Sequence, residues 1–139
     1  MNKTLEILLI EDDVIEVMKL RRTIKSLELN HKITVAENGE DAIKILNTVE
    51  KLPELILLDL NMPKINGIEF LSIIKKDDRF HHIPAVILST SSNRSDIVEC
   101  YRIGIAGYVI KPLKYEDYVE KIEKLLAYWS INELNILIR

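Results

Sequence analysis

The chain contains a single cysteine, Cys100, among its 139 residues. One thiol cannot form an internal disulfide or the multi-thiolate ligand set of a structural zinc site, so both devices are excluded. The lack of a disulfide framework is typical of a reducing compartment, and we predict a cytoplasmic location. Cys100 lies in a segment of helical period, where we expect it to act as a small apolar residue of the core.

Long apolar runs and an excess of basic charge are also lacking. No run approaches the ~20 apolar residues that a membrane-spanning helix needs. In the first residues, MNKTLEILLIEDD, the apolar stretch before the three acids is too short for a signal peptide. The formal net charge is -3, which gives no basic surface for coating nucleic acid. We therefore predict neither a membrane association nor direct nucleic-acid binding.

Five short apolar runs are present, and a longer segment of helical period follows each of them. The runs cover residues 5–10, 33–36, 55–58, 85–88 and 108–110. A continuous apolar run indicates a strand that is covered on both faces, since a strand with one wet face would alternate. Alternating strands and helices predict an α/β fold, in which a doubly wound five-stranded parallel sheet is joined by right-handed crossovers. The length allows one domain, which we assign to residues 1–129, with residues 130–139 as a short tail.

Two of the helical segments carry clear apolar stripes. The first stripe consists of Val17, Leu20, Ile24 and Leu27, and the second of Tyr118, Ile122, Leu125 and Trp129. Residues at these spacings share one face of a helix, so we expect both stripes to pack against the sheet.

Polar residues stand at the carboxyl ends of four runs. Glu11, Asp12 and Asp13 follow the first run, Asp59 the third, Ser89, Thr90 and Ser91 the fourth, and Lys111 the fifth. In an open parallel sheet these ends meet at one edge, where ligands bind. Clustered carboxylates raise each other's pKa unless a cation lies among them, and Mg²⁺ is the hard cation that takes oxygen ligands while keeping positions open for phosphate. The pattern predicts a site that holds an oxyanion against a metal ion.

These residues resemble the receiver domain of two-component response regulators. The resemblance covers residues 5–129 and rests on the ordered motifs EDD, DLNMPKING, LSTSS and GYVIKP, each at the end of a different run. It implies the flavodoxin-like receiver fold, with five helices and the strand order 2-1-3-4-5. The stretch SSNRSDI and the segment LLAYW are most similar to small stand-alone receivers of the chemotaxis-regulator type, including those that partner with bacterial phytochromes.

The resemblance implies a phosphoryl acceptor with a metal beside it. Asp59 matches the aspartate that takes a phosphoryl group from a sensor histidine kinase or a phosphotransfer protein. Asp12 would hold Mg²⁺ directly and Glu11 through water, while Asp59 and the backbone carbonyl of Asn61 would complete the ligand set.

The resemblance also implies a switch. Ser89 matches the hydroxyl that moves toward the phosphoryl group, Lys111 the lysine that pairs with the phosphorylated acid, and Tyr108 the aromatic residue that moves between exposed and buried positions. It implies a cis Lys111–Pro112 bond, although an X–Pro bond taken alone favours trans.

The motifs are compatible with three functions of different classes. The favoured one is a phosphorylation-switched signalling module that is not an enzyme beyond self-directed phosphoryl transfer and autodephosphorylation. A haloacid dehalogenase-type enzyme also uses a strand-end aspartate, but it needs a second acid two residues later, where this chain has Asn61. The third is a passive flavodoxin-like scaffold without phosphorylation.

The individual residues also have plainer roles. Asp59 alone is more simply a turn or helix cap, and Asp13 favourably charges a helix N-terminus. The segment 89–91 is ordinary cap material, Lys111 a surface charge, and Tyr108 a packed strand residue. The coincidence of four strand ends favours the phosphoacceptor interpretation over these roles.

The expected output is contact with a downstream protein target. The surface of the fourth and fifth helical segments carries the mixed charges of Arg94, Asp96, Glu99, Arg102, Glu120, Lys121 and Lys124. Such charges either only solvate a surface or form a homodimer interface through the fourth helix, fifth strand and fifth helix, and both alternatives stay open. In the tail, Ile131, Leu134 and Leu137 are apolar enough to dock, for example on a neighbouring subunit.

Overall fold

The computed structural model describes residues 3–62 and 66–134, in which five strands alternate with five helices. The elements are β1 (Glu6–Ile10), α1 (Val14–Ser26), β2 (Lys32–Ala36), α2 (Gly39–Thr48), β3 (Leu55–Leu58), α3 (Gly67–Lys75), β4 (Ala85–Ser89), α4 (Arg94–Ile103), β5 (Gly107–Ile110) and α5 (Tyr115–Ser130). All neighbouring strands are parallel, in the order β2-β1-β3-β4-β5. The predicted fold class and strand order are confirmed.

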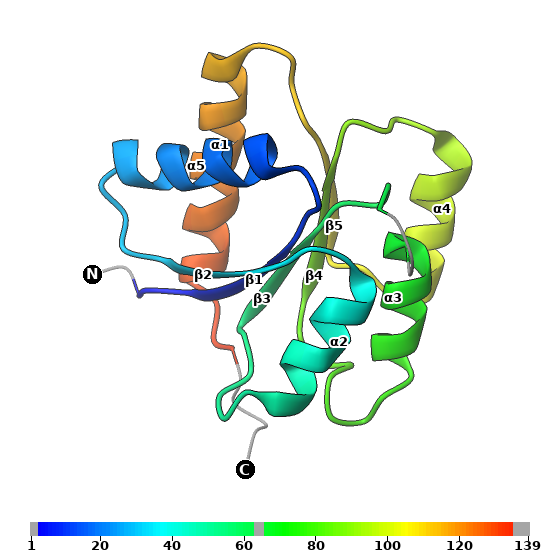
Figure 1. Ribbon diagram of the computed structural model, residues 1–139. Coiled ribbons are helices and arrows are strands. Elements are labelled where there is room, and N and C mark those ends of the chain that lie inside the picture. The colour runs from blue at the N-terminus through cyan, green and yellow to red at the C-terminus, as the bar shows by residue number, and fades with distance from the viewer. Residues whose placement is uncertain (1–2, 63–65, 135–139) are drawn as a thin grey trace.

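Helices cover both faces of the sheet (Figure 1). α1 and α5 pack on one face, and α2, α3 and α4 pack on the other. Along β1, Leu8 and Ile10 belong to the core under α2 and α3, whereas Ile7 and Leu9 belong to the core under α1 and α5. Because successive side chains of a strand point to opposite faces, a strand covered on both faces needs apolar residues at every position.

The strand ends differ slightly from the apolar runs, because backbone pairing and not apolarity decides where a strand ends. Lys32 pairs with Glu6, which extends β2 by one polar residue, and Ser89 pairs with Ile110, which extends β4. Ser89 is therefore held by the sheet itself and does not begin the following loop. This pairing places its hydroxyl at a defined point of the sheet edge.

The two predicted apolar stripes face the sheet. In α1, Leu20 and Ile24 are buried. In α5, Ile122 and Leu126 are fully buried, whereas Leu125 is only partly buried and lies at the border of the contact. The buried residues of α5 recur every four positions, so Leu126 takes the place that the predicted stripe gave to Leu125. Across the described part of the chain, no helix combines the length and the apolar composition needed to span a membrane.

Polar caps join the strands to the helices that follow them. The Asp13 carboxylate accepts a hydrogen bond from the Ile15 N–H at the start of α1, which places Asp13 at a helix N-terminus as expected and makes it the N-cap. At α4 the cap is Asn93, whose side chain accepts from the Ser95 and Asp96 N–H groups. Residues 89–91 are consequently not the cap of α4, so the plainer role suggested for them is wrong.

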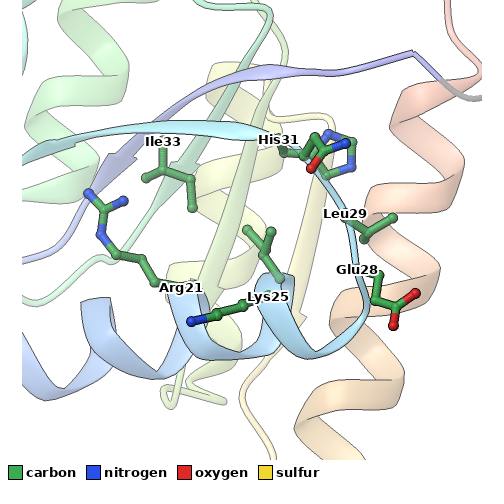
Figure 2. Close-up of a pocket in the computed structure, with 8 residues that line it drawn as sticks. Arg21, Lys25, Glu28, Leu29, His31 and Ile33 are labelled. Atoms are coloured by element: carbon green, nitrogen blue, oxygen red, sulfur yellow. The ribbon is translucent and has the colours of Figure 1, made fainter.

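α1 ends in a turn that holds Glu28 in the left-handed region, with φ 58°. The Glu28 N–H donates to the Lys25 carbonyl and the Leu29 N–H to the Ile24 carbonyl, which closes the helix end in the manner usually built on glycine. Glu28 and His31 line a hollow of about 350 Å³, and both side chains are labelled in Figure 2. This hollow lies near the start of β2, at the opposite end of the strands from Asp59.

Replacing Glu28 with glycine is expected to raise the free energy of unfolding by about 0.5–1 kcal/mol, because glycine adopts a positive φ without the clash of a Cβ. Urea denaturation measures the change. Glu28→Ala is the matched control, since it removes the charge and keeps the Cβ. An equal gain in Glu28→Ala would assign the effect to the side chain and contradict the backbone explanation.

Candidate functional site

Three carboxylates meet where β1 and β3 end. Glu11 and Asp12 directly follow β1, and Asp59 directly follows β3. The two strands are neighbours, with Ile10 paired to Leu58 and the Asp59 N–H donating to the Ile10 carbonyl at 3.0 Å. One carboxylate oxygen from each of the three acids lies within 4.8 Å of the others. The predicted convergence of these residues is confirmed.

The electrostatics of the cluster suit a cation. Burial raises the pKa of the Asp59 carboxyl, with Lys111 opposing the rise and the charge of Asp12 adding to it. Burial likewise raises the pKa of Glu11, against the lowering effect of its hydrogen bond with Lys111. Three hard oxygen donors in one cluster form a donor set that Mg²⁺ takes, and a divalent charge would relieve their repulsion. The residues present therefore fit the metal that the sequence predicts.

Lys111 follows β5 and is almost completely buried, with a side chain that is 6% exposed. Its Nζ lies 2.9 Å from Glu11 Oε1 and 3.1 Å from Glu16 Oε1. Within the described residues these glutamates are its ion-pair partners, and Asp59 is not among them. The Lys111–Pro112 bond is trans, so the cis bond implied by the resemblance is wrong and the ordinary preference of X–Pro bonds holds.

Glu16 is the residue of this site that the sequence analysis did not single out. Its spacing from Asp13 matches a capping box, in which the Glu16 carboxylate would turn back to the Asp13 N–H. In the structure that N–H donates to Glu11 Oε2 at 3.3 Å instead, and Glu16 pairs with Lys111. The sequence signal for Glu16 was therefore present, but it indicated the wrong partner.

Ser89 and Tyr108 both bond to Ser91, in the loop after β4. The Ser89 side chain is fully buried, and its Oγ accepts a hydrogen bond from the Ser91 N–H at 3.1 Å. The Tyr108 hydroxyl donates to the Ser91 carbonyl at 2.8 Å, while its ring packs beside the core under α2, α3 and α4. The structure thus links the two predicted switch residues through one loop residue.

The loop after β3 exposes Asn61, whereas Leu60 and Met62 on either side of it are buried. Asn61 is exposed and lines a hollow of about 420 Å³ together with Met62 and Asn66. The ligand role of the Asn61 carbonyl stays a prediction. Residues 63–65 of the DLNMPKING motif lie outside the described residues.

Asp59 is expected to cost stability at neutral pH when no cation is bound. Because folding raises the pKa of Asp59 above the value of 3.8, the folded protein holds this proton more tightly than the unfolded chain does. That contribution is present below the unfolded pKa and is lost as the pH rises through the folded pKa.

Asp59→Asn in chelator should therefore have a higher free energy of unfolding than the unchanged protein near neutral pH, and the difference should shrink toward about pH 4. Millimolar Mg²⁺ should raise the unfolding temperature of the unchanged protein more than that of Asp59→Asn, as calorimetry can measure. Equal Mg²⁺ shifts in the two proteins would contradict the expected role of Asp59.

Known proteins share both the sequence and the fold of this chain. Residues 7–123 match the response regulator receiver domain family. The probable methanogenesis regulatory protein FilR2 of Methanothrix harundinacea is 36% identical over 127 residues, which cover 88% of this chain and 82% of that protein. Response regulator Rcp1 of Synechocystis is 30% identical, with 88% of this chain and 87% of that protein covered.

Solved structures agree with these relatives. The phosphorylated cyanobacterial phytochrome response regulator RcpA superposes with a TM-score of 0.88 at 29% identity, covering 96% of this chain and 99% of that one. The Mn²⁺-bound form of Rcp1 superposes with a TM-score of 0.84 at 28% identity, covering 93% and 96%. Because the family match runs from β1 into α5, the chain belongs to the response regulator receiver domains of two-component systems.

Proposed function

We propose that this receiver domain accepts a phosphoryl group on Asp59 from a sensor histidine kinase or a phosphotransfer protein, in a Mg²⁺-dependent reaction. The observation that carries the proposal is the cluster of Glu11, Asp12 and Asp59 at an open sheet edge, with the buried ammonium of Lys111 paired to one of its members. Receiver domains act as phosphoacceptor switches and not as classical enzymes, and the similar RcpA structure is that of a phosphorylated protein.

Phosphoryl transfer needs an in-line nucleophile and neutralised charge more than it needs acid–base chemistry. A carboxylate oxygen of Asp59 attacks the phosphorus, and the bond from phosphorus to the donor breaks with its electron pair leaving on the donor. Lys111 offsets charge on the transferred group. Glu11, Asp12, Asp59 and the Asn61 carbonyl would hold Mg²⁺, which supplies positive charge beside the phosphoryl oxygens; the Mn²⁺-bound structure of Rcp1 supports this metal assignment.

The response is carried by Ser89 and Tyr108. A phosphoryl oxygen draws the Ser89 hydroxyl away from the Ser91 N–H, and the Tyr108 ring fills the space behind it after its bond to the Ser91 carbonyl breaks. This changes the surface of α4, β5 and α5 that a downstream protein target contacts. Coupling between two such sites is typically about 1–3 kcal/mol, so it shifts a balance between two states.

The same surface is our candidate contact for a second copy of the chain. Four of its expected charges pair locally, Arg102 with Glu99 and Lys124 with Glu120. The exposed apolar side chains of Val98, Tyr101 and Ile110 lie on these elements as well. We retain a homodimer through α4, β5 and α5 as the alternative to a monomer that contacts only its target.

We further place the receiver domain at residues 1–129, the tail at residues 130–139 and the protein in the cytoplasm. Ser130 still belongs to α5, and Leu134 packs beside the core under α1 and α5. Ile131 is 71% exposed. Leu137, the third apolar residue of the tail, lies outside the described residues.

Incubation with acetyl phosphate and Mg²⁺ tests the phosphoacceptor function. We expect a mass gain of one phosphoryl group per chain, located on the peptide that contains Asp59. Turnover of added phosphomonoesters without a lasting label would instead support a haloacid dehalogenase-type enzyme, and complete inertness would support a passive scaffold. Either of those two results would overturn the proposal.

A further inference from the structure

We propose that Glu16 is a positioning residue, which holds the Lys111 ammonium away from Asp59 until Asp59 is phosphorylated. The inference deepens the proposed function and rests on it for the phosphorylated state. It concerns the ion pair between α1 and the end of β5, a contact that lies beside the acidic cluster and is separate from its three carboxylates.

One buried ammonium is shared by two carboxylates. Lys111 Nζ lies 2.9 Å from Glu11 and 3.1 Å from Glu16, and the two glutamate side chains are 5% and 24% exposed. Within the part of the chain that the structure describes, Asp59 makes no ion pair with Lys111. A phosphoryl oxygen on Asp59 would therefore compete with the two glutamates for the Lys111 ammonium.

The two glutamates differ in what a metal would do to them. Glu11 belongs to the cluster with Asp12 and Asp59, so a bound cation competes with Lys111 for its carboxylate. Glu16 lies outside that cluster and stays available to Lys111 when a cation is bound. Glu16 is thus the partner that sets how readily Lys111 leaves.

Separating the Lys111 ammonium from Glu16 costs free energy. Glu16 Oε1 is buried and has no hydrogen-bond partner among the described residues, so the nearby charge of Lys111 is what compensates it. A buried acceptor that loses its compensating partner pays its full desolvation cost. The interaction of Lys111 with the phosphoryl group must offset this free-energy cost when the ammonium moves toward Asp59.

The start of α1 does not depend on the Glu16 carboxylate. The Asp13 N–H donates to Glu11, and the Ile15 N–H donates to the Asp13 side chain. The helix is held to the sheet by Leu20 and Ile24. Glu16→Gln should therefore remove the charge without removing the helix.

Beryllium fluoride with Mg²⁺, which mimics an acyl phosphate, provides the first test. We expect Glu16→Gln to bind it about three- to tenfold more tightly than the unchanged protein, as for loss of a partly exposed ion pair. Asp13→Asn is the matched control, because it removes one negative charge from the same helix start while asparagine still caps the helix. Its affinity should change by less than about twofold.

Two outcomes of this titration, followed by amide NMR shifts, would overturn the proposal. Equal tightening in Glu16→Gln and Asp13→Asn would mean that general repulsion and not the ion pair is responsible. Unchanged affinity in Glu16→Gln would mean that the contact does not restrain Lys111. A Glu16 that only stabilised α1 would lower the unfolding temperature and leave the affinity unchanged.

The free protein provides the second test, which needs no phosphoryl mimic. In metal-free buffer, the Lys111 ammonium protons should exchange with solvent faster in Glu16→Gln than in the unchanged protein or in Asp13→Asn, as nitrogen-15 NMR of lysine can measure. Unchanged exchange rejects the positioning role. Faster exchange in a protein that never binds beryllium fluoride would support the positioning of Lys111 and reject the proposed phosphoacceptor function.

Discussion

Replacing Asp59 with asparagine is expected to abolish labelling by acetyl phosphate and to leave the domain folded. The amide of asparagine is nearly isosteric with the carboxylate but offers no anionic oxygen for attack, so labelling should fall by at least about 100-fold. Asp59 is 9% exposed and caps the end of a strand whose four residues are all 0% exposed, so the core is unaffected by the change. Intact mass measures the label, and circular dichroism measures the fold.

Asp12→Asn is the control for this experiment, because it removes the same charge from the same cluster and keeps the acceptor. Asp12 is the exposed member of the cluster, and its expected role is to hold the metal. We expect slower labelling that excess Mg²⁺ partly restores. Undiminished labelling of Asp59→Asn would move the acceptor away from Asp59, and undiminished labelling of Asp12→Asn at low Mg²⁺ would contradict the metal role of Asp12.

Replacing Gly67 with alanine is expected to destabilise the protein by about 2–3 kcal/mol, as overpacking against backbone does. A Cβ at this position would lie 2.6 Å from the Asp59 carbonyl oxygen and 2.7 Å from Leu60 Cα. These are backbone atoms of the loop that carries the acceptor, and they cannot rotate away as a side-chain tip can. The Gly67 N–H also donates to the Leu60 carbonyl at 3.0 Å, which holds the start of α3 against this loop.

Gly107→Ala is the matched control, since a Cβ there would meet only the two Val86 methyl groups at 4.0 Å. We expect it to change the free energy of unfolding by less than about 1 kcal/mol. Urea denaturation compares the two variants, and acetyl phosphate labelling should slow in Gly67→Ala alone because the clash displaces the Asp59 backbone. Equal free energies of unfolding in the two variants would contradict the predicted clash, because the loop would then accommodate the added Cβ without cost.

The continuous apolar run of β3 shows how far the sequence could predict this fold. Four successive apolar residues require cover on both faces of a strand, so the parallel sheet and the position of Asp59 at its edge followed directly. The resemblance to receiver domains added the strand order. The precise strand ends did not follow, because the pairing of Ser89 with Ile110 is a backbone contact that residue type does not report.

Side-chain partners were the least predictable part of the site. Glu16 has the spacing of a capping box, but the Asp13 N–H that it would have met already bonds to Glu11. Local spacing cannot reveal that competition, because Lys111 reaches Glu16 from a strand end far along the chain. The Lys111–Pro112 bond is trans, as the generic preference of X–Pro bonds predicts and against the cis bond that the resemblance implied.

The sequence by itself determined which groups reach the site, because apolar runs end on Glu11, Asp12, Asp59, Ser89 and Lys111 and parallel strands bring their carboxyl ends to one edge. Only the tertiary structure decided how those groups pair. The Lys111 ammonium is shared between Glu11 and Glu16 because burial leaves a charged group no water to bond, so it takes the carboxylates that packing of α1 against the sheet brings within reach.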